Sequence, residues 1–376
     1  MSKVIYLDNA ATTRIRDEVL DEMLPFLKDE YGNPSALYSA GREARRAVEQ
    51  ARERVAAALG AASPKEIYFT SSGTEADNWA LRKYSGRGRI VTDAAEHHAI
   101  LNTAKDLKAR GRDVHILRVD KYGMVSPRDI GAVLKDGGGL VSVMAVNNEV
   151  GTINPIHEIA ATAKAHGAVV HTDAVQAVGH MQIDVKTLGV DMMSVSAHKF
   201  YGPKGVGALY VKGGTPLNTM ITGGAQERGR RAGTENVASI VGMGKAIELI
   251  DRETERNIAH ENSLGKRLCD RMLREIPGAR LNGHPLIRVW GNVSFSFESI
   301  RTETLLVSLD QEGIACSGGS ACAAGSVEPS HVLIAMGGEG GRRNGALRFS
   351  IGRYNTVKEI DETVEALKKI IFKIKK

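Results

Sequence analysis

The sequence predicts an α/β protein with a large, mostly parallel sheet and a smaller α+β domain. Between about residues 65 and 212, short β-rich runs that end in small or polar residues alternate with stretches of helical periodicity. Such alternation is typical of βαβ units, in which helices cover both faces of a parallel sheet. After about residue 245 the pattern changes, and a long charged helix is followed by isolated strands. With 376 residues, the chain is long enough for two domains.

Seven segments in the first part have the composition of strands. They are Glu66–Thr70, Arg89–Thr92, Val114–Val119, Leu140–Asn147, Ala168–Thr172, Met192–Ser196 and Gly207–Val211. Helices are expected between several of them, at Thr74–Tyr84, His98–Arg110 and Ile156–His166. We therefore expect a seven-stranded sheet flanked by helices. Ligands of such sheets bind beyond the carboxyl ends of the strands.

The second part predicts fewer strands and longer helices. The expected elements are a helix at Ile247–Ile276, a strand at Asn292–Phe297, a helix near Glu303–Glu312, a Gly/Ser/Ala-rich loop at Ser317–Ser326, a helix from about Pro329, a strand at Ala346–Ile351 and a helix at Val357–Lys376. We expect residues 14–250 to form the large domain, and residues 1–13 and 251–376 to form the small one.

Composition narrows the class of protein. Hydrophobic residues make up 42% and charged residues 25%, as in ordinary soluble proteins. The three cysteines include no CxxC pair, which argues against a disulfide framework and a zinc ribbon. No apolar run suits a signal peptide or a membrane span, so we expect a cytoplasmic protein with no membrane partner. The net charge of +6 favours anionic ligands or an acidic protein partner. Nucleic acid is a weaker expectation, because few aromatic residues accompany the basic clusters.

Polar residues follow several of the expected strands. The turn at Ser71–Ala76 joins a strand to a helix N-terminus, where free N–H groups favour an anion, although taken alone it is better explained as an ordinary helix cap. Asp173 ends another strand, with Gln176 three residues on, and its carboxylate suits a protonated pyridine nitrogen or a plain turn cap. Lys199 lies between an apolar strand and a Gly/Pro-rich loop, where partial desolvation would lower its pKa and favour an imine-forming amine. A single lysine is nevertheless usually a solvated surface charge. Together, in this order, these groups indicate a pyridoxal-phosphate enzyme whose Schiff-base lysine is Lys199.

The sequence also resembles a known family along essentially its whole length. The matching segments are Tyr6–Thr13, Gly32–Ser35, Thr70–Asn78, Glu96-His97, Val146–Gly151, His171–Gln176, the Lys199 segment, Gly223–Gly229, Gly233-Thr234, Ser320–Cys322 and Leu347–Ser350. In these it is similar to the NifS/IscS-type cysteine desulfurases, which are class V aminotransferase-like enzymes of pyridoxal-phosphate fold type I. Two positions depart from the family pattern: Tyr38 stands where histidine is usual, and Ala197 where glycine is frequent.

The resemblance implies a role for each matching residue. Lys199 would hold the cofactor and move the Cα proton, Asp173 would pair with the pyridine nitrogen, and His97 would stack on the ring and transfer protons. Asn148 and Gln176 would lie near the ring hydroxyl. The phosphate would be held by Gly73, Thr74, Ser196 and His198, with Thr234 supplied by the other subunit of a homodimer. Arg348 would clamp the substrate carboxylate, assisted by Asn33 and with Asn148 near the substrate.

Cys322 decides the expected reaction. Its Gly/Ser/Ala-rich surroundings offer few packing contacts, which suits a thiolate that has to move between substrate and acceptor. The resemblance implies that L-cysteine gives L-alanine and a Cys322 persulfide, which passes to an IscU-like iron–sulfur cluster scaffold or another acceptor. It also allows Cys322 to ligate a [2Fe–2S] cluster transiently, shared with that scaffold. Cys269 and Cys316 are expected to be structural.

Two other readings remain open at this point. A class V aminotransferase or a selenocysteine lyase would use the same cofactor, and an aminotransferase would not need Cys322. Alternatively, the chain could act mainly as a scaffold partner that supplies Cys322 as a cluster ligand. Lys199 argues against this second reading, because a binding module has no use for a Schiff-base lysine.

Overall fold

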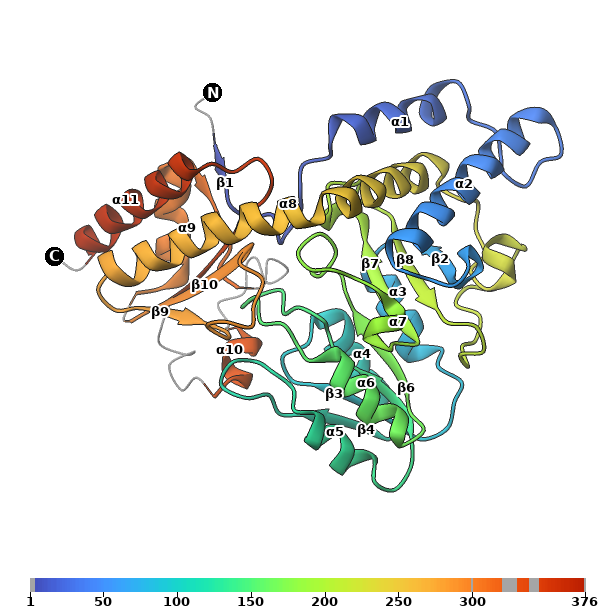
Figure 1. The fold of residues 1–376 in the computed structure, drawn as a ribbon, viewed down its shortest axis with the longest axis horizontal. Coiled ribbons are helices and arrows are strands. Elements are labelled where there is room, and N and C mark those ends of the chain that lie inside the picture. The colour runs from blue at the N-terminus through green and yellow to red at the C-terminus, as the bar shows by residue number, and fades with distance from the viewer. Residues whose placement is uncertain (1–3, 299, 320–329, 338–344, 375–376) are drawn as a thin grey trace.

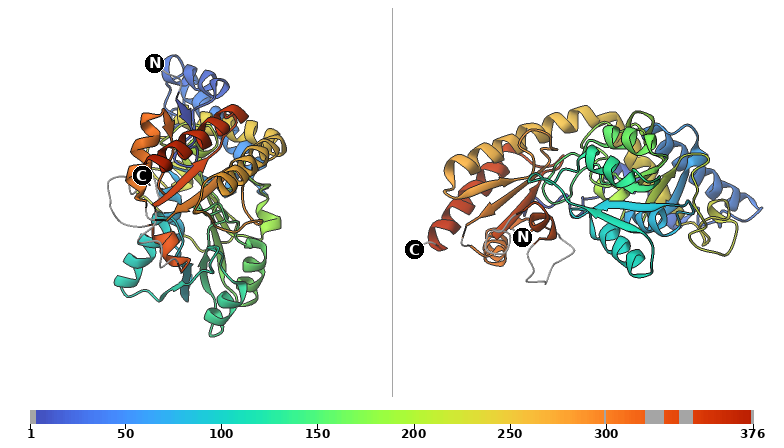
Figure 2. Two further views of the ribbon diagram at one scale, coloured as in Figure 1. Left: turned by 90° about the vertical axis from the view of Figure 1, so that its left-hand side faces the viewer. Right: turned by 90° about the horizontal axis from the view of Figure 1, so that it is seen from below.

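The computed structural model describes residues 4–298, 300–319, 330–337 and 345–374 (Figure 1). Cys322 lies outside these residues. A seven-stranded sheet and a smaller region of short sheets lie side by side, and the long helix α8 (Val237–Glu275) runs across both (Figures 1 and 2). None of the helices in the described ranges combines the length and apolar character needed to cross a membrane.

The expected seven-stranded, mostly parallel sheet is confirmed. Its order is β2 (Ile67–Thr70), β8 (Gly207–Val211), β7 (Met192–Ser196), β6 (Val169–Asp173), β5 (Gly139–Ser142), β3 (Arg89–Asp93) and β4 (Val114–Leu117). Strand β8 is antiparallel to both neighbours, and the other pairs are parallel. The expectation that one strand continues to Asn147 is wrong. Regular pairing of β5 stops at Ser142, since the chain then bends into a turn held by the Asn147 side chain, which accepts the N–H groups of Glu149 and Val150.

Helices cover both faces of this sheet. One face packs on α3 (Gly73–Arg82) and α4 (His98–Ala109), and the other on α2 (Ser39–Ala58), α5 (Pro127–Leu134), α6 (Ile156–Ala165) and α8. Successive strand residues point to opposite faces, so Ile67 and Phe69 join one hydrophobic core and Tyr68 joins the other. Helix α1 (Asp17–Lys28) packs on α8, and α7 (Val185–Leu188) is a single turn.

The smaller region has its own hydrophobic core. It contains the antiparallel sheet β12–β10–β9 (Gly345–Ser350, Asn292–Phe297, Ala279–Asn282) and the parallel pair β1–β11 (Ile5–Tyr6, Ile314–Ala315). Its helices are α9 (Thr302–Gln311) and α11 (Val357–Ile374), whereas Val332 of α10 (His331–Ala335) packs against Ala95 and Val150 of the sheet region. Leu268 from α8, Phe295, Phe349 and Leu367 share this core.

Helix α8 begins ten residues before the expected start at Ile247. The sequence before Ile247 contains Gly242 and Gly244, and glycine disfavours helices. A Cβ at Gly242 would lie 2.5 Å from the Met23 sulfur, and one at Gly244 would lie 2.7 Å from the Cβ of Ala51. Both glycines therefore allow α8 to pack closely on α1 and α2, and tertiary packing outweighs local propensity here.

A buried ion pair holds an unusual backbone turn beside β2. Glu227 has a left-handed conformation with φ 46°, which disfavours a residue with a side chain. Arg52 donates to both carboxylate oxygens of Glu227, at 2.8 and 2.9 Å, and also to the carbonyl of Ile67. The N–H of Phe69 donates to the same carboxylate at 3.1 Å. These contacts offset the strain and connect the turn to the sheet.

Replacing Arg52 with methionine is expected to lower the free energy of unfolding by about 3–5 kcal/mol, because it leaves the Glu227 carboxylate buried without its cation. Urea unfolding measures the change. Arg46→Met on the same helix is the matched control, since Arg46 pairs with Glu43 in solvent, and it should cost no more than about 1 kcal/mol. Equal effects of the two substitutions would contradict this account of the turn.

Candidate functional site

A cavity of about 180 Å³ opens at the carboxyl ends of the central strands. The residues around it that the sequence analysis had singled out are Gly73, Thr74, His97, Asn148, Asp173, Gln176, Ser196, His198, Lys199 and Arg348. Asp173 ends β6, Ser196 ends β7, and Gly73 begins the helix after β2. The topology explains this clustering, because parallel strands end at the same edge of the sheet.

One end of the cavity is suited to an anion. The hydroxyl of Ser72 caps α3 by accepting the Glu75 N–H at 3.2 Å, so the first turn of α3 faces the cavity with other N–H groups. A Cβ on Gly73 would lie 2.8 Å from the Val175 side chain, so only glycine allows this turn to lie so close to the end of β6. Ser196 and His198 line the same cavity. Burial and the nearby Lys199 charge lower the pKa of His198 to about 4, so its ring is neutral at neutral pH.

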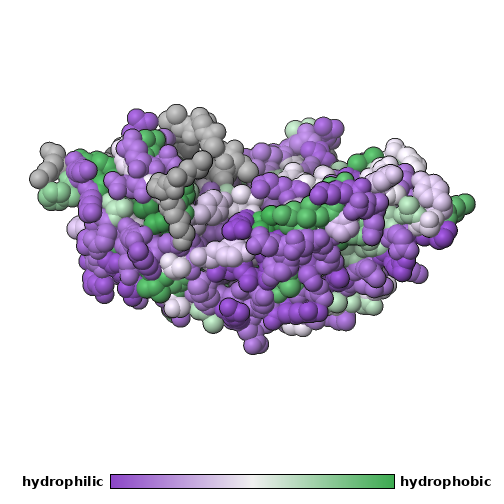
Figure 3. Space-filling model, turned by 90° about the horizontal axis from the view of Figure 1, so that it is seen from above, coloured by the Kyte–Doolittle hydropathy of each residue, from purple (hydrophilic) through white to green (hydrophobic). Residues whose placement is uncertain are grey.

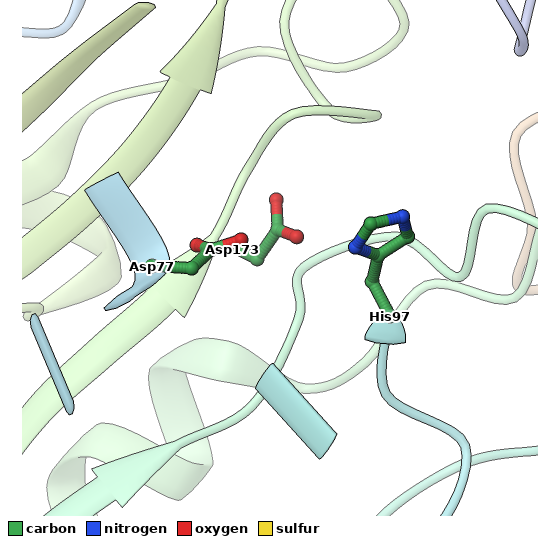
Figure 4. A group of neighbouring side chains, drawn as sticks. All are labelled: Asp77, His97 and Asp173. Atoms are coloured by element: carbon green, nitrogen blue, oxygen red, sulfur yellow. The ribbon is translucent and has the colours of Figure 1, made fainter. Parts of the chain in front are cut away.

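Two buried carboxylates, Asp77 and Asp173, line the cavity (Figure 4). Asp173 accepts the Val175 N–H at 2.8 Å, and burial raises its pKa to about 6. Asp77 is 1% exposed, and its Oδ1 has no hydrogen-bond partner in the described part of the chain. Burial, and then the charge of Asp173, raise the pKa of Asp77. Two carboxyl groups so close together favour a cationic partner or a shared proton.

His97 faces these carboxylates from the start of α4 (Figure 4). One ligand atom each of Asp77, His97 and Asp173 lie within 4.8 Å of one another. The Nδ1 atom of His97 accepts the Ala99 N–H at 3.1 Å, so the neutral ring carries its proton on Nε2. Burial, and then the Lys199 charge, lower the pKa of His97 to about 4. The distances alone would suit a metal ion, but Lys199 lines the same cavity and its charge would repel one.

The N-terminal segment forms a wall of the cavity that the sequence analysis had not assigned. The Lys199 ammonium donates to the carbonyl oxygens of Ala10 and Ala11, at 2.5 and 2.8 Å. The side-chain amide of Gln176 donates to the carbonyl of Ala10 at 2.9 Å. The main chain supplies these contacts, so no side-chain pattern could have revealed them.

Arg348 reaches the cavity from β12 in the smaller region and is 1% exposed. It donates to Asp8 Oδ1 and to the backbone carbonyl of Asn148, each at 2.9 Å. Its Nε and the Oδ1 atom of Asn148 lack hydrogen-bond partners within the described ranges. The sequence did not lead us to expect Asp8 at this site. Arg348 therefore forms an ion pair with Asp8 in addition to its expected role of binding the substrate carboxylate.

Three expected site residues do not line this cavity. Asn33 is exposed, and its side chain accepts the Ser35 N–H at 2.9 Å. Thr234 is exposed in a separate cavity beside Arg231 and Glu235. The expected nucleophile Cys322 lies outside the described residues.

The other two cysteines lie against the core of the smaller region, as expected of structural residues. Cys269 is 3% exposed, and burial raises the pKa of its thiol. Cys316 is half-buried, and burial, with the Asp8 charge, raises its pKa to about 12. Because the thiolate is the nucleophile, Cys316 is poorly suited to attack at neutral pH.

Comparison with known proteins agrees with this geometry. The family "Aminotransferase class-V" matches residues 5–363. The chain is 47% identical to the cysteine desulfurase IscS of Methanosarcina thermophila over 379 residues, which cover 100% of this chain and 93% of that protein. It is 50% identical to the cysteine desulfurase IscS of Clostridium botulinum, and the match covers 99% of this chain and 95% of that protein.

Solved structures give the same result. A NifS-like protein superimposes with a TM-score of 0.91 at 39% identity, and covers 98% of this chain and 100% of its own. A NifS-like protein from Rickettsia africae superimposes with a TM-score of 0.89 at 31% identity, and the match covers 98% of this chain and 100% of that protein. The chain therefore belongs to the class-V aminotransferase family, among the IscS- and NifS-like cysteine desulfurases.

Proposed function

We propose that this protein is a cysteine desulfurase that converts L-cysteine into L-alanine and leaves the sulfur as a persulfide on Cys322. The observation that carries the proposal is the single cavity lined by Lys199, Asp173 and Arg348, in a chain about half identical to IscS proteins along its length. The cavity is thus lined by the amine of Lys199, the carboxyl group of Asp173 and the guanidinium of Arg348, which is suited to bind the substrate carboxylate.

Membership of this family implies pyridoxal phosphate as the cofactor, and the residues present fit it. The carboxylates of Asp77 and Asp173 call for a cation, which a protonated pyridine nitrogen supplies. The glycine turn at Gly73, with Thr74, Ser196 and His198, would hold the phosphate. Lys199 would hold the cofactor covalently, and Asn148 and Gln176 would lie near its ring hydroxyl. When bound, the cofactor would withdraw electrons from the substrate Cα.

The chain's own groups account for the remaining steps. Arg348 would bind the carboxylate of cysteine, and Lys199 would take the Cα proton. His97, which carries a proton on Nε2, would assist proton transfer next to the ring. The Cys322 sulfur would form a bond to the substrate sulfur as the carbon–sulfur bond breaks. The carbon gains a hydrogen, so one cysteine and one thiol give alanine and a persulfide.

The division into domains is part of the proposal. Along α8, Ile250 packs into a hydrophobic core of the seven-stranded sheet, and the residues from Leu264 onward pack into the core of the smaller region. This change of core partner supports a boundary near residue 250, with residues 1–13 joining 251–376 in the small domain. Arg348 and the segment that contains Cys322 would then belong to the small domain, and Lys199 to the large one.

We further propose a homodimer in which Thr234 of each chain completes the phosphate site of its partner. The exposed position of Thr234 suits this role, as do the exposed side chains of Leu27, Tyr31, Leu37 and Tyr38 around the α1–α2 connection. The face that includes this end of the molecule is otherwise mainly hydrophilic (Figure 3). Large exposed apolar side chains are often contact sites. Asn33 lies in this same connection and could assist Arg348 only from a partner.

The proposed acceptor of the persulfide is an IscU-like iron–sulfur cluster scaffold, with which Cys322 could transiently share a [2Fe–2S] cluster. The IscS relatives support this assignment only through their family membership. The cytoplasmic location remains a prediction from the sequence.

Replacing Lys199 with alanine is expected to abolish desulfurase activity and the visible absorbance of lysine-bound pyridoxal phosphate, because no other amine would hold the cofactor. Lys204→Ala is the matched control, since Lys204 is exposed five residues away and does not line the cavity. Absorption spectra before and after borohydride treatment test the prediction. A Lys199→Ala protein that keeps both its colour and its turnover would disprove the assignment.

Replacing Cys322 with serine is expected to reduce alanine formation from cysteine to background while leaving the cofactor bound. Cys316→Ser should keep wild-type turnover, because burial holds that thiol protonated. Alanine assays, together with mass spectrometry of the cysteine-treated protein, should locate the persulfide on Cys322. Full turnover by Cys322→Ser would rule out the persulfide route and favour an aminotransferase.

A further inference from the structure

Glu149 is a buried carboxylate that the proposed reaction does not use. It is 1% exposed, and its Oε1 atom lacks a hydrogen-bond partner among the described residues. It directly follows Asn148, whose side chain lines the cavity and whose carbonyl accepts from Arg348. A buried carboxylate with an unpaired oxygen is costly to stability, so its contacts call for a functional explanation.

These contacts are with the two described residues that flank the segment containing Cys322 in the sequence. The hydroxyl of Ser330 donates to Glu149 Oε2 at 2.5 Å, directly after residues 320–329. Gly319, directly before them, is so close that a Cβ built on it would lie 3.0 Å from the same oxygen. One carboxylate therefore meets the residues on either side of this segment.

His331 provides a second connection to the cavity wall. Its Nδ1 lies 4.0 Å from Glu149 Oε1, and its Nε2 lies 2.9 Å from the carbonyl of Glu96. A carbonyl only accepts, so Nε2 carries the proton and Nδ1 faces the carboxylate. The ring of His331 packs on that of His98, with 4.4 Å between centroids. Glu96 and His98 are the two neighbours of His97, so these contacts hold His331 beside His97.

We propose that Glu149 is a positioning residue for Cys322: it holds Gly319 and Ser330, the residues that flank the stretch 320–329 in the sequence, beside the substrate cavity. The proposal rests on the proposed function, in which Cys322 takes sulfur from the bound substrate. Cys322 lies between these two flanking residues in the sequence, so holding them beside the cavity would favour proximity of its thiol to the substrate, and proximity of this kind accelerates a reaction step. Binding of the cofactor and of cysteine does not depend on the contact.

The test uses the cofactor-loaded proteins Glu149→Gln, Ser330→Ala and the double variant. Persulfide on Cys322 is followed by rapid quenching and mass spectrometry, and cysteine binding by the change in cofactor absorbance. We expect each single variant to form persulfide about tenfold more slowly or worse, in the range that misplacement produces. Cofactor content and cysteine affinity should stay unchanged. The double variant should be no slower than the slower single variant, because both changes remove the same contact.

Two controls separate this role from a general loss of structure. Ser330 also caps α10, so Ser63→Ala, which removes a cap far along the chain, should leave persulfide formation unchanged. Ser330→Thr keeps the hydroxyl and should restore the rate. Wild-type rates in Glu149→Gln and Ser330→Ala, or slow rates that excess pyridoxal phosphate restores, would overturn the inference. Absence of persulfide from Cys322 in the wild type would instead refute the proposed function itself.

Discussion

The carboxylate pair of Asp77 and Asp173 is the constraint on which the rest of the site depends. Both side chains are buried, and burial raises the pKa of each, so the pair is unfavourable until a cation or a proton joins it. The sheet makes the pair unavoidable, because Asp173 ends β6 and α3, which begins after β2, carries Asp77. The protonated ring nitrogen of a bound cofactor would relieve the repulsion, and the two carboxylates would keep it in the charged form that suits an electron sink.

The N-terminal segment makes the two regions into one site. Ala10 accepts from Lys199 and Gln176 of the sheet region, and two residues earlier Asp8 accepts from Arg348 of the smaller region. Strand β1 also pairs with β11 in that smaller region. The distance between Lys199 and Arg348 is therefore set by residues 8–10, which are far in the sequence from both side chains. A shift of one region relative to the other would change this distance, and with it the fit of a substrate that contacts both.

The sequence predicted all seven strands of the large sheet and most of the cavity, because strand composition is local and parallel strands bring their ends together. It could not predict features that depend on contacts distant along the chain. The start of α8 was not predicted because Gly242 and Gly244 disfavour a helix locally, and their role, which is to allow close packing on α1 and α2, depends on distant residues. Asp77 was missed because an acid inside a helix usually faces solvent, and Asp8 because its partner is 340 residues away. Asn33 and Thr234 were expected by resemblance, and one chain alone does not bring them to its own cavity.

Glu149 shows how the two needs of a sulfur-transfer reaction can coexist. The substrate has to be held still, and Lys199, Asp173 and Arg348 are fixed by strands and buried contacts. In the proposed function, the accepting thiol, by contrast, would have to reach both the substrate and a separate sulfur acceptor. The carboxylate of Glu149 meets Gly319 and Ser330, the two residues that flank the segment containing Cys322, so its proposed effect on the thiol acts through these neighbours. Burying an acid with one unpaired oxygen lowers stability, and such costs persist mainly where function depends on them.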